Sequence, residues 1–261
     1  MTKSLGRSLR IEARVVFALL MREVLTRYGR HNIGFLWLFV EPMIYTVGIT
    51  ILWNATGATH GSNLPISEFA LTGYSSVLLW RNMPGRCSLA IVPNSALMYH
   101  RNVKVIDIFL SRILLEVAGN TSSFFILMLI FYAVGLVELP NDILQVVFGW
   151  ILLIWFGASL AFIVGALSEK SEVVEKLWHP ATYLMFPLSG AIFMVEWLPP
   201  RFQDVVLWLP MVHGVEILRE GYFGDRVVAH YDLGYMVRVC LSMTLIGLAL
   251  VRDVSRKVTP E

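Results

Sequence analysis

Residues 143–167 read ILQVVFGWILLIWFGASLAFIVGAL, a run without a single charged side chain. A helix needs about 20 apolar residues to cross the roughly 30 Å hydrocarbon core of a bilayer, so this run predicts a transmembrane helix. The rest of the chain has the same character, because 56% of its 261 residues are hydrophobic and only 15% are charged. Soluble domains rarely have such a composition. We therefore expect an all-α membrane protein.

Five further apolar stretches, on both sides of this run, bring the number of predicted transmembrane helices to six. The six spans cover residues 33–54, 67–92, 108–135, 143–167, 179–196 and 235–251. The second is interrupted by two arginines and a proline, and the fifth is short and contains two prolines. The other four have the length and apolar character of ordinary spans.

The distribution of Lys and Arg predicts the orientation. Seventeen of the twenty-one lie before residue 33, between Arg81 and Arg112, in the loop 168–178 or after residue 251, and the loops 55–66 and 136–142 have none. Basic residues in short loops stay on the cytoplasmic side, so we expect both termini in the cytoplasm. The net charge of +2 mostly reflects this bias, and the sequence contains no nucleic-acid-binding module.

Three regions follow from this pattern. Residues 1–32 are expected to form a cytoplasmic amphipathic helix on the membrane surface, because Lys3, Arg7, Arg10 and Arg14 recur at helical spacing opposite apolar residues. A flexible basic leader is the alternative. Residues 33–251 form the six-span transmembrane domain, and residues 252–261 form a cytoplasmic tail.

Within the transmembrane domain, the segment before the last span is irregular. It contains two apolar pieces, 181–195 and 205–218. Each is shorter than the roughly 20 residues that a membrane-spanning helix needs. Proline-broken apolar pieces at membrane depth are tolerated where they line a cavity or are buried in protein. We therefore predict a re-entrant helical segment at about 199–218, with His213, Glu216 and Arg219 near the outer exit.

Polar residues inside spans are functional candidates, since charge at membrane depth is costly. Glu41 and Arg81 lie within the first and second spans, while Arg112, Glu116, Asn120 and Ser123 share one face of the third. One interpretation is that these groups line a hydrated route. The alternative is that Arg112 and Glu116 form a structural pair near the cytoplasmic boundary of the membrane, and that the Arg81 side chain extends to the same boundary. In the fourth span, Gly157, Ala161 and Gly165 form a small-residue stripe that favours close helix packing, within the chain or between two copies.

Motifs for catalysis and nucleotide binding are absent from the sequence. It contains neither a G-x-x-x-x-G-K-[ST] phosphate loop nor an H-E-x-x-H zinc motif. Its two cysteines lie far apart and have no metal-binding spacing. We expect no catalytic residue, metal site or cofactor in this chain, so energy for any transport must come from another protein.

Several short motifs resemble the bacterial capsular polysaccharide export permeases, which are membrane subunits of ABC transporters. The resemblance begins with REVLTRYGR at 22–30 and continues through GFLW at 34–37 to Glu41-Pro42. It extends through LTGY at 71–74, Arg81-Asn82, YHRNVK at 99–104, Asp107, Arg112, PLSG at 187–190, WLP at 197–199, PMVHGVE at 210–216 and GYFG at 221–224. It covers nearly the whole chain.

This resemblance implies a homodimer in the bacterial inner membrane that works with two copies of a cytoplasmic ATPase, which holds ATP and magnesium. It further implies a lipid-linked capsular glycan as substrate and partner proteins in the periplasm and outer membrane. The loop from Asn94 to Asp107 is similar to the coupling helix that contacts the ATPase. Its expected contact residues are Asn94, Leu97, Tyr99, His100, Arg101, Lys104 and Asp107.

A long flexible glycan should be held weakly at many points. Aromatic rings suit this task because they stack on sugar faces without fixing the register, and cationic groups attract acidic units. The expected path residues are Trp37, Glu41, Tyr45, Arg81, Arg112, Glu116, Trp155, Trp178, Tyr183 and Trp197. Tryptophan and tyrosine also populate membrane interfaces for other reasons. Two further alternatives are a passive channel and an intramembrane enzyme for a lipid-linked sugar that uses Glu41, Glu116 and His213.

Overall fold

The chain folds into a bundle of helices. The computed structural model describes residues 5–28, 32–57, 64–98 and 103–258, and every regular element in these ranges is helical. The longer helices are α1 (Leu5–Tyr28), α2 (Asn32–Thr56), α3 (Ile66–Cys87), α5 (Val105–Ala133), α6 (Ile143–Ser168), α7 (Glu172–Met185), α9 (Pro210–Phe223) and α10 (Leu233–Val258). The short ones are η1 (Val92–Asn94), α4 (Ser95–Met98), η2 (Val195–Trp197), α8 (Pro200–Val206) and η3 (Gly224–Arg226).

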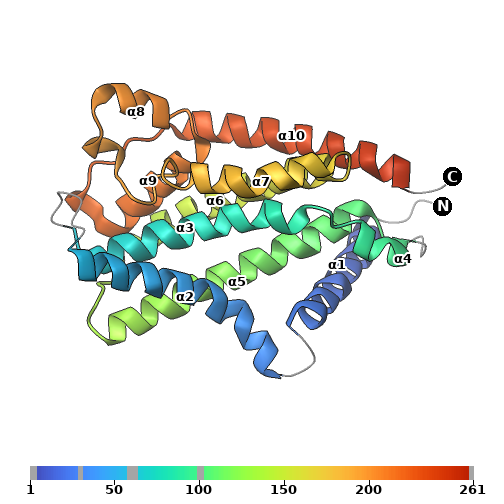
Figure 1. Ribbon diagram of the computed structural model, residues 1–261, viewed down its shortest axis with the longest axis horizontal. Helices are drawn as coiled ribbons and strands as arrows, with labels where there is room; N and C mark the ends of the chain where they lie inside the picture. The colour runs from blue at the N-terminus through green and yellow to red at the C-terminus, as the bar shows by residue number, and fades with distance from the viewer. Residues whose placement is uncertain (1–4, 29–31, 58–63, 99–102, 259–261) are drawn as a thin grey trace.

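The long helices run side by side along the long axis of the molecule (Figure 1). α6 lies at the centre and packs against α3, α9 and α10, while α5 packs against α1, α2 and α3. Both chain termini lie at one end of the bundle, which we call the terminal end. α8 and α9 lie at the opposite end, which we call the distal end.

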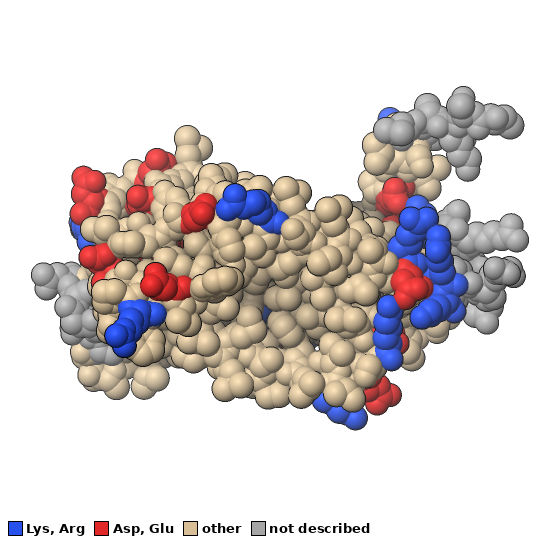
Figure 2. Space-filling model, turned by 90° about the horizontal axis from the view of Figure 1, so that it is seen from above, with Lys and Arg blue, Asp and Glu red and all other residues tan. Residues whose placement is uncertain are grey.

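On one face of the molecule, the charged side chains lie toward its two ends (Figure 2). On the face drawn in Figure 2, Lys and Arg gather at the terminal end, and the middle of the face is largely uncharged. A band without charge between two charged ends is the surface that a bilayer-embedded protein presents. The terminal end is therefore the end for which the Lys and Arg distribution predicts a cytoplasmic location.

Four helices are long and apolar enough to cross a membrane, in the part of the chain that the structure describes. They are Leu36–Thr56, Val105–Ala133, Ile143–Ser168 and Leu233–Lys257. Each coincides with one of the four regular spans expected from the sequence. Their existence is thus confirmed, and their boundaries differ from the expected ones by a few residues, except that the last extends to Lys257.

The predicted fifth span, 179–196, is wrong as a continuous helix. α7 begins earlier, at Glu172, and ends at Met185, and turns follow from Phe186 to Ile192. Its 14 residues reach about 21 Å at the usual rise, which is less than the hydrocarbon thickness. Gly190 has a φ of 81°, a backbone conformation that glycine adopts readily, and the chain changes direction there.

The predicted second span, 67–92, also ends too late. α3 stops at Cys87, and the chain then enters the short helices η1 and α4. The 22 residues of α3 extend about 33 Å, which is long enough to cross a bilayer. Its buried residues include Glu68, Ser75 and Ser76, so this helix is more polar than the four apolar spans.

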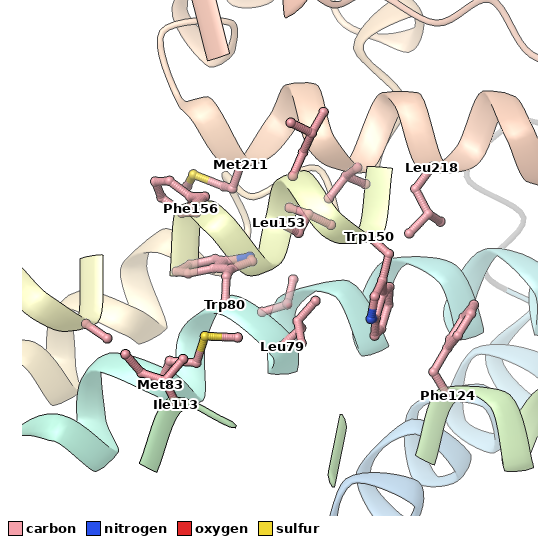
Figure 3. Packing of buried hydrophobic residues seen from close by; sticks show 14 of the residues in the cluster. Leu79, Trp80, Met83, Ile113, Phe124, Trp150, Leu153, Phe156, Met211 and Leu218 are labelled. Atoms are coloured by element: carbon pink, nitrogen blue, oxygen red, sulfur yellow. The ribbon is translucent and has the colours of Figure 1, made fainter. Parts of the chain in front are cut away.

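The core lies between α3, α5, α6 and α9. Trp80 of α3 is fully buried, and its ring meets Phe156 of α6 edge-on at 5.8 Å between centroids (Figure 3). Trp150 stacks on Phe124 of α5 at 4.6 Å. A Cβ atom added at Gly157 would lie 2.9 Å from the Trp80 Cα. The small-residue stripe of α6 therefore serves packing within the chain, against α3.

α9 packs tightly against the first half of α6. A Cβ added at Gly214 would lie 2.7 Å from Leu153 Cδ2, and one added at Gly221 would lie 2.7 Å from the Val146 backbone nitrogen. Because the partner numbers fall as the α9 numbers rise, the two helices are antiparallel. α9 starts beside the middle of α6 and ends near the first residues of α6.

α1 packs along α5 at the terminal end. Its residues Val16, Leu19 and Val24 are buried, whereas Leu9, Phe17, Met21 and Leu25 are exposed. The helix thus has a second apolar face that the described part of this chain does not cover.

Candidate functional site

A cavity of about 240 Å³ opens between α2, α3, α5 and α7, and it is the best candidate for a functional site. Its lining is polar and aromatic for a position among apolar helices. The lining residues are Leu38, Glu41, Pro42, Tyr45, Tyr74, Leu78, Arg81, Asn82, Arg86, Glu116, Gly119, Asn120 and Tyr183. Five of the path residues expected from the sequence meet here, namely Glu41, Tyr45, Arg81, Glu116 and Tyr183.

Helical periodicity explains why α3 contributes the largest share of this lining. Residues 74, 78, 81–82 and 86 recur at intervals of three or four and therefore share one face. On α5, Glu116 and Asn120 share a face in the same way. Gly119 lies between them, and a Cβ there would lie 2.8 Å from Leu38 Cδ1 of α2. This close approach of α2 and α5 brings Glu41 and Glu116 to the same cavity.

Arg86 joins three helices at this cavity. Its Nε lies 3.1 Å from Oε1 of Glu116 on α5, and its Nη2 lies 3.8 Å from Oε1 of Glu41 on α2. The Glu116 side chain is only 5% exposed, and the Arg86 guanidinium helps to stabilise its charge. Arg86 was not among the expected path residues, although its spacing from Tyr74, Leu78 and Asn82 on α3 points to it.

Arg112 lies outside the cavity, on the side of the terminal end. Its Nε is 3.2 Å from Glu23 Oε1 of α1, and its Nη1 donates to the Arg86 carbonyl oxygen at 2.6 Å. The structure thus pairs Arg112 with Glu23 and Glu116 with Arg86. Ser123 donates to the Phe39 carbonyl oxygen at 2.6 Å, so the polar face predicted for the third span does face other helices.

Arg81 has different surroundings from Arg86 and Arg112. Its guanidinium carbon lies 4.9 Å from the centre of the Tyr183 ring. Tyr74, two turns earlier on α3, packs edge-on against Phe186 at 5.7 Å between centroids. The cavity therefore combines one arginine, three tyrosines and the Arg86 ion pairs.

The remaining expected path residues lie elsewhere. Trp37 is half exposed on α2. Trp155 donates from its Nε1 to Thr244 Oγ1 of α10 at 3.0 Å, so it joins two packed helices. Trp178 lies beside Gly85 of α3, since a Cβ there would be 3.5 Å from its Nε1. Trp197 stacks on Phe69 at the distal end, 5.2 Å between ring centroids.

The segment expected to contact an ATPase lies at the terminal end, in η1 and α4 and before α5. Asn94 is buried and accepts a hydrogen bond from Arg22 Nη1 of α1 at 2.5 Å. Leu97 is half-buried against the core. Asp107 is buried and accepts from the Lys104 backbone nitrogen at 2.9 Å, which caps α5. Tyr99, His100 and Arg101 lie outside the described residues.

Two ionisable groups beside this segment tie it to its neighbours. Lys104 Nζ lies 2.9 Å from Glu12 Oε1 of α1, and this hydrogen bond raises the pKa of Lys104. Glu169, which follows α6, accepts from the Ile91 backbone nitrogen at 2.8 Å. Burial raises the pKa of Glu169, although that hydrogen bond opposes the change.

The polar residues of α9 form a separate cluster at the distal end. Arg219 is fully buried and donates to the carbonyl oxygens of Gly190, Ala191 and Phe193 at 2.5, 2.6 and 2.7 Å. Its guanidinium lies over the Phe69 ring at 3.7 Å. These contacts hold the non-helical segment after α7 in place.

Glu216 and His213 likewise bind backbone groups of neighbouring short segments. Glu216 accepts from the backbone nitrogens of Val195 and His230, at 3.1 and 2.9 Å. His213 bonds through Nε2 to the Leu207 carbonyl oxygen and accepts at Nδ1 from the Asp232 nitrogen, both at 2.9 Å. The three residues suggested for acid–base chemistry are therefore not assembled, since His213 lines a distal groove and Glu41 and Glu116 line the cavity.

Comparison with known proteins adds a family and relatives. Residues 14–223 match the family model described as ABC-2 type transporter. The chain is 43% identical to the capsule polysaccharide export inner-membrane protein CtrC of Neisseria meningitidis serogroup B, over 99% of this chain and 97% of CtrC. It is 41% identical to the capsule polysaccharide export inner-membrane protein BexB of Haemophilus influenzae, over 97% of this chain and 96% of BexB. The polysialic acid transport protein KpsM of Escherichia coli is 29% identical over 91% of this chain and 92% of KpsM.

Proposed function

Because this chain belongs to the ABC-2 type transporter family, we propose that it is the membrane permease of an ATP-driven exporter of lipid-linked capsular polysaccharide. The observation that carries this proposal is its similarity, above 40% over nearly the full length, to two inner-membrane proteins of capsule polysaccharide export. The four apolar helices fit a multi-pass inner-membrane protein. ATP and magnesium would be bound by a separate cytoplasmic ATPase subunit.

The proposed topology has six membrane segments, α2, α3, α5, α6, α7 and α10. α7 completes its crossing through the turns that follow Met185, and α9 forms a re-entrant element entered from the periplasmic side. Support for the re-entrant element comes from α9 starting beside the middle of α6 and returning to the beginning of α6. α1 lies on the cytoplasmic leaflet with its exposed apolar residues in the lipid, and both termini are cytoplasmic.

We assign the cavity between α2, α3, α5 and α7 to the polysaccharide path. Tyrosine rings and hydroxyl groups offer weak contacts that a moving polymer can exchange, and water in a polar cavity keeps charged groups solvated. A homodimer would carry two such cavities, and partner proteins in the periplasm and outer membrane would receive the glycan. Trp37, exposed on α2, remains a candidate for contact with either the glycan or the second copy.

We also place the ATPase contact at η1, α4 and the segment up to Lys104. Support comes from the exposed residues Val92, Pro93, Ser95 and Ala96 at the terminal end. Asn94 and Asp107 would act indirectly, because they hold the segment against α1 and α5. Arg101→Glu is expected to weaken binding of the ATPase and leave membrane insertion unchanged.

Export and ATP hydrolysis are tested together. The gene is deleted in its host and surface polysaccharide is measured, after which the chain is purified with and without a candidate ATPase subunit from the same host. We expect the deletion strain to accumulate polysaccharide inside the cell. We also expect the pure chain to hydrolyse no ATP. Surface polysaccharide at the normal level, or ATP hydrolysis by the chain alone, would reject the proposal.

A further inference from the structure

Arg81 is a cation without a counter-ion in the described part of the chain. Both carboxylates of the cavity lining, Glu41 and Glu116, lie against Arg86. No hydrogen bond or ion pair joins the Arg81 guanidinium to another described residue, and its contact is with the face of the Tyr183 ring. Arg81 and Arg86 lie five residues apart on one helix, yet only the charge of Arg86 is neutralised by carboxylates of the described residues.

An uncompensated guanidinium among membrane helices is costly unless water or an anion accompanies it. The contact with Tyr183 occupies one face of the planar group. The N–H donors at its edge remain available, and their geometry fits the paired oxygens of a carboxylate or phosphate. Because Arg81 lines a cavity, such a group can reach it.

The neighbours of Arg81 offer further hydrogen bonds to a bound ligand. Tyr45, Tyr74 and Tyr183 line the same cavity, and none of their hydroxyl groups bonds to another described residue. The buried amide oxygen of Asn120, in the same lining, has no hydrogen-bond partner within the described residues. Donors for an anion and acceptors for sugar hydroxyls are therefore both present around one cation.

We propose that this cavity is a subsite for a single anionic group, a carboxylate or phosphate carried on a sugar or a lipid, which Arg81 binds with the help of the Tyr45, Tyr74 and Tyr183 hydroxyls. The inference rests on the proposed function, because it gives the export path a point that recognises charge. Arg86 is excluded from this role by its two carboxylate partners. The subsite holds one charge at a time, so a polymer with repeated acidic units can advance from unit to unit.

The test uses the purified full chain in nanodiscs of phosphatidylcholine, without the ATPase. The sugar probes are an oligomer of galacturonic acid and a neutral dextran oligomer of the same length, and their binding is measured by microscale thermophoresis. The lipid probe is phosphatidylglycerol added to the nanodiscs, and its retention is counted by native mass spectrometry. The variants are Arg81→Gln, Arg81→Lys and Tyr74→Phe, with Arg201→Gln of the exposed helix α8 as a control that removes one positive charge elsewhere.

The acidic oligomer should bind more tightly than the neutral one, and Arg81→Gln should weaken it about tenfold or more, since a hydrogen-bonded charge pair is lost. Tyr74→Phe, which keeps the ring contact with Phe186, should weaken it about fivefold. Arg81→Lys should lose less than Arg81→Gln, and Arg201→Gln should match the wild type. Loss of phosphatidylglycerol alone in Arg81→Gln would identify a lipid phosphate as the occupant, whereas loss of the acidic sugar alone would identify a sugar acid.

Equal binding of both probes by Arg81→Gln and the wild type would overturn the subsite. Monodispersity and thermal stability are measured for each variant, and a variant that matches the wild type in both shows that its binding loss is not a folding defect. Tyr74→Phe provides the second reading if Arg81→Gln does not fold. No transport is scored in these measurements. Binding without polysaccharide export in the host would therefore reject the export proposal and leave the anion subsite standing.

Discussion

At the scale of single residues, Arg86 is the cation that lies against both carboxylates of the cavity lining. Glu116 is nearly buried and lies 3.1 Å from Arg86, so Arg86→Gln leaves a buried carboxylate without its cation. We expect the free energy of unfolding in detergent to fall by about 1–3 kcal/mol. The double variant Arg86→Gln, Glu116→Gln also removes the buried negative charge and should recover part of this loss. Equal destabilisation of the single and double variants would show that the pair is not the cause.

Gly73 is a second residue whose identity the structure explains. A Cβ there would overlap the Ala191 carbonyl oxygen and lie 2.5 Å from Arg219 Nη2. Gly73→Ala should therefore destabilise the protein by about 1–3 kcal/mol through overpacking, measured by thermal or denaturant unfolding. Gly48→Ala is the matched control, because no atom lies within 4 Å of the added Cβ and alanine favours a helix by about 0.5–1 kcal/mol. A neutral Gly73→Ala would contradict the packing at this contact.

At the scale of elements, α9 organises the distal end through its polar side chains. Glu216 accepts hydrogen bonds from the Val195 and His230 nitrogens, so Glu216→Leu should free both amides. Hydrogen–deuterium exchange should accelerate in peptides covering 190–197 and 227–232, and exchange in α5 should stay unchanged. Exchange that rises throughout the protein would indicate general unfolding and would count against this local role.

Variants in the short helices η1 and α4 should distinguish residues that stabilise the fold from residues that contact the proposed ATPase. Asn94→Ala removes the hydrogen bond to Arg22 of α1, and we expect it to lower the free energy of unfolding by about 1 kcal/mol. Ala96 is exposed, so Ala96→Glu should leave stability unchanged and weaken association with the proposed ATPase in a pull-down assay. Normal association of Ala96→Glu would move the contact away from this helix.

At the scale of the whole molecule, the arrangement of charge predicts how the bundle sits in the membrane. Basic side chains gather at the terminal end (Figure 2), which should face the cytoplasm. Leu139 and Val173 are exposed residues near opposite ends of α6. In intact spheroplasts, an impermeant maleimide should label Leu139→Cys and spare Val173→Cys. The native thiols of Cys87 and Cys240 are buried, so their background labelling should be low. The reverse pattern would invert the proposed topology.

The four regular transmembrane helices follow from the sequence alone, because a run of about 20 apolar residues has no other comfortable environment than a bilayer. The sequence also identified Glu41, Tyr45, Arg81, Glu116 and Tyr183 as polar or aromatic residues worth explaining. The free-energy cost of placing a polar side chain inside the bilayer depends on the residue type and its position in its helix. It can therefore be inferred from the sequence without knowing which residues pack nearby. The motifs shared with capsular polysaccharide export permeases indicated the family, because they are short stretches that can be recognised one by one along the chain.

Tertiary structure decided which of these residues meet and what each one does. Arg86 and Arg81 look alike in the sequence, yet only Arg86 lies against two carboxylates, because Gly119 lets α2 and α5 approach there. The predicted fifth span became a shorter helix followed by turns, since Arg219, far along the chain, satisfies the carbonyl groups that the broken helix leaves open. Partners that lie far apart in sequence and close in space leave no periodic signal along the chain, so only the packed fold reveals them.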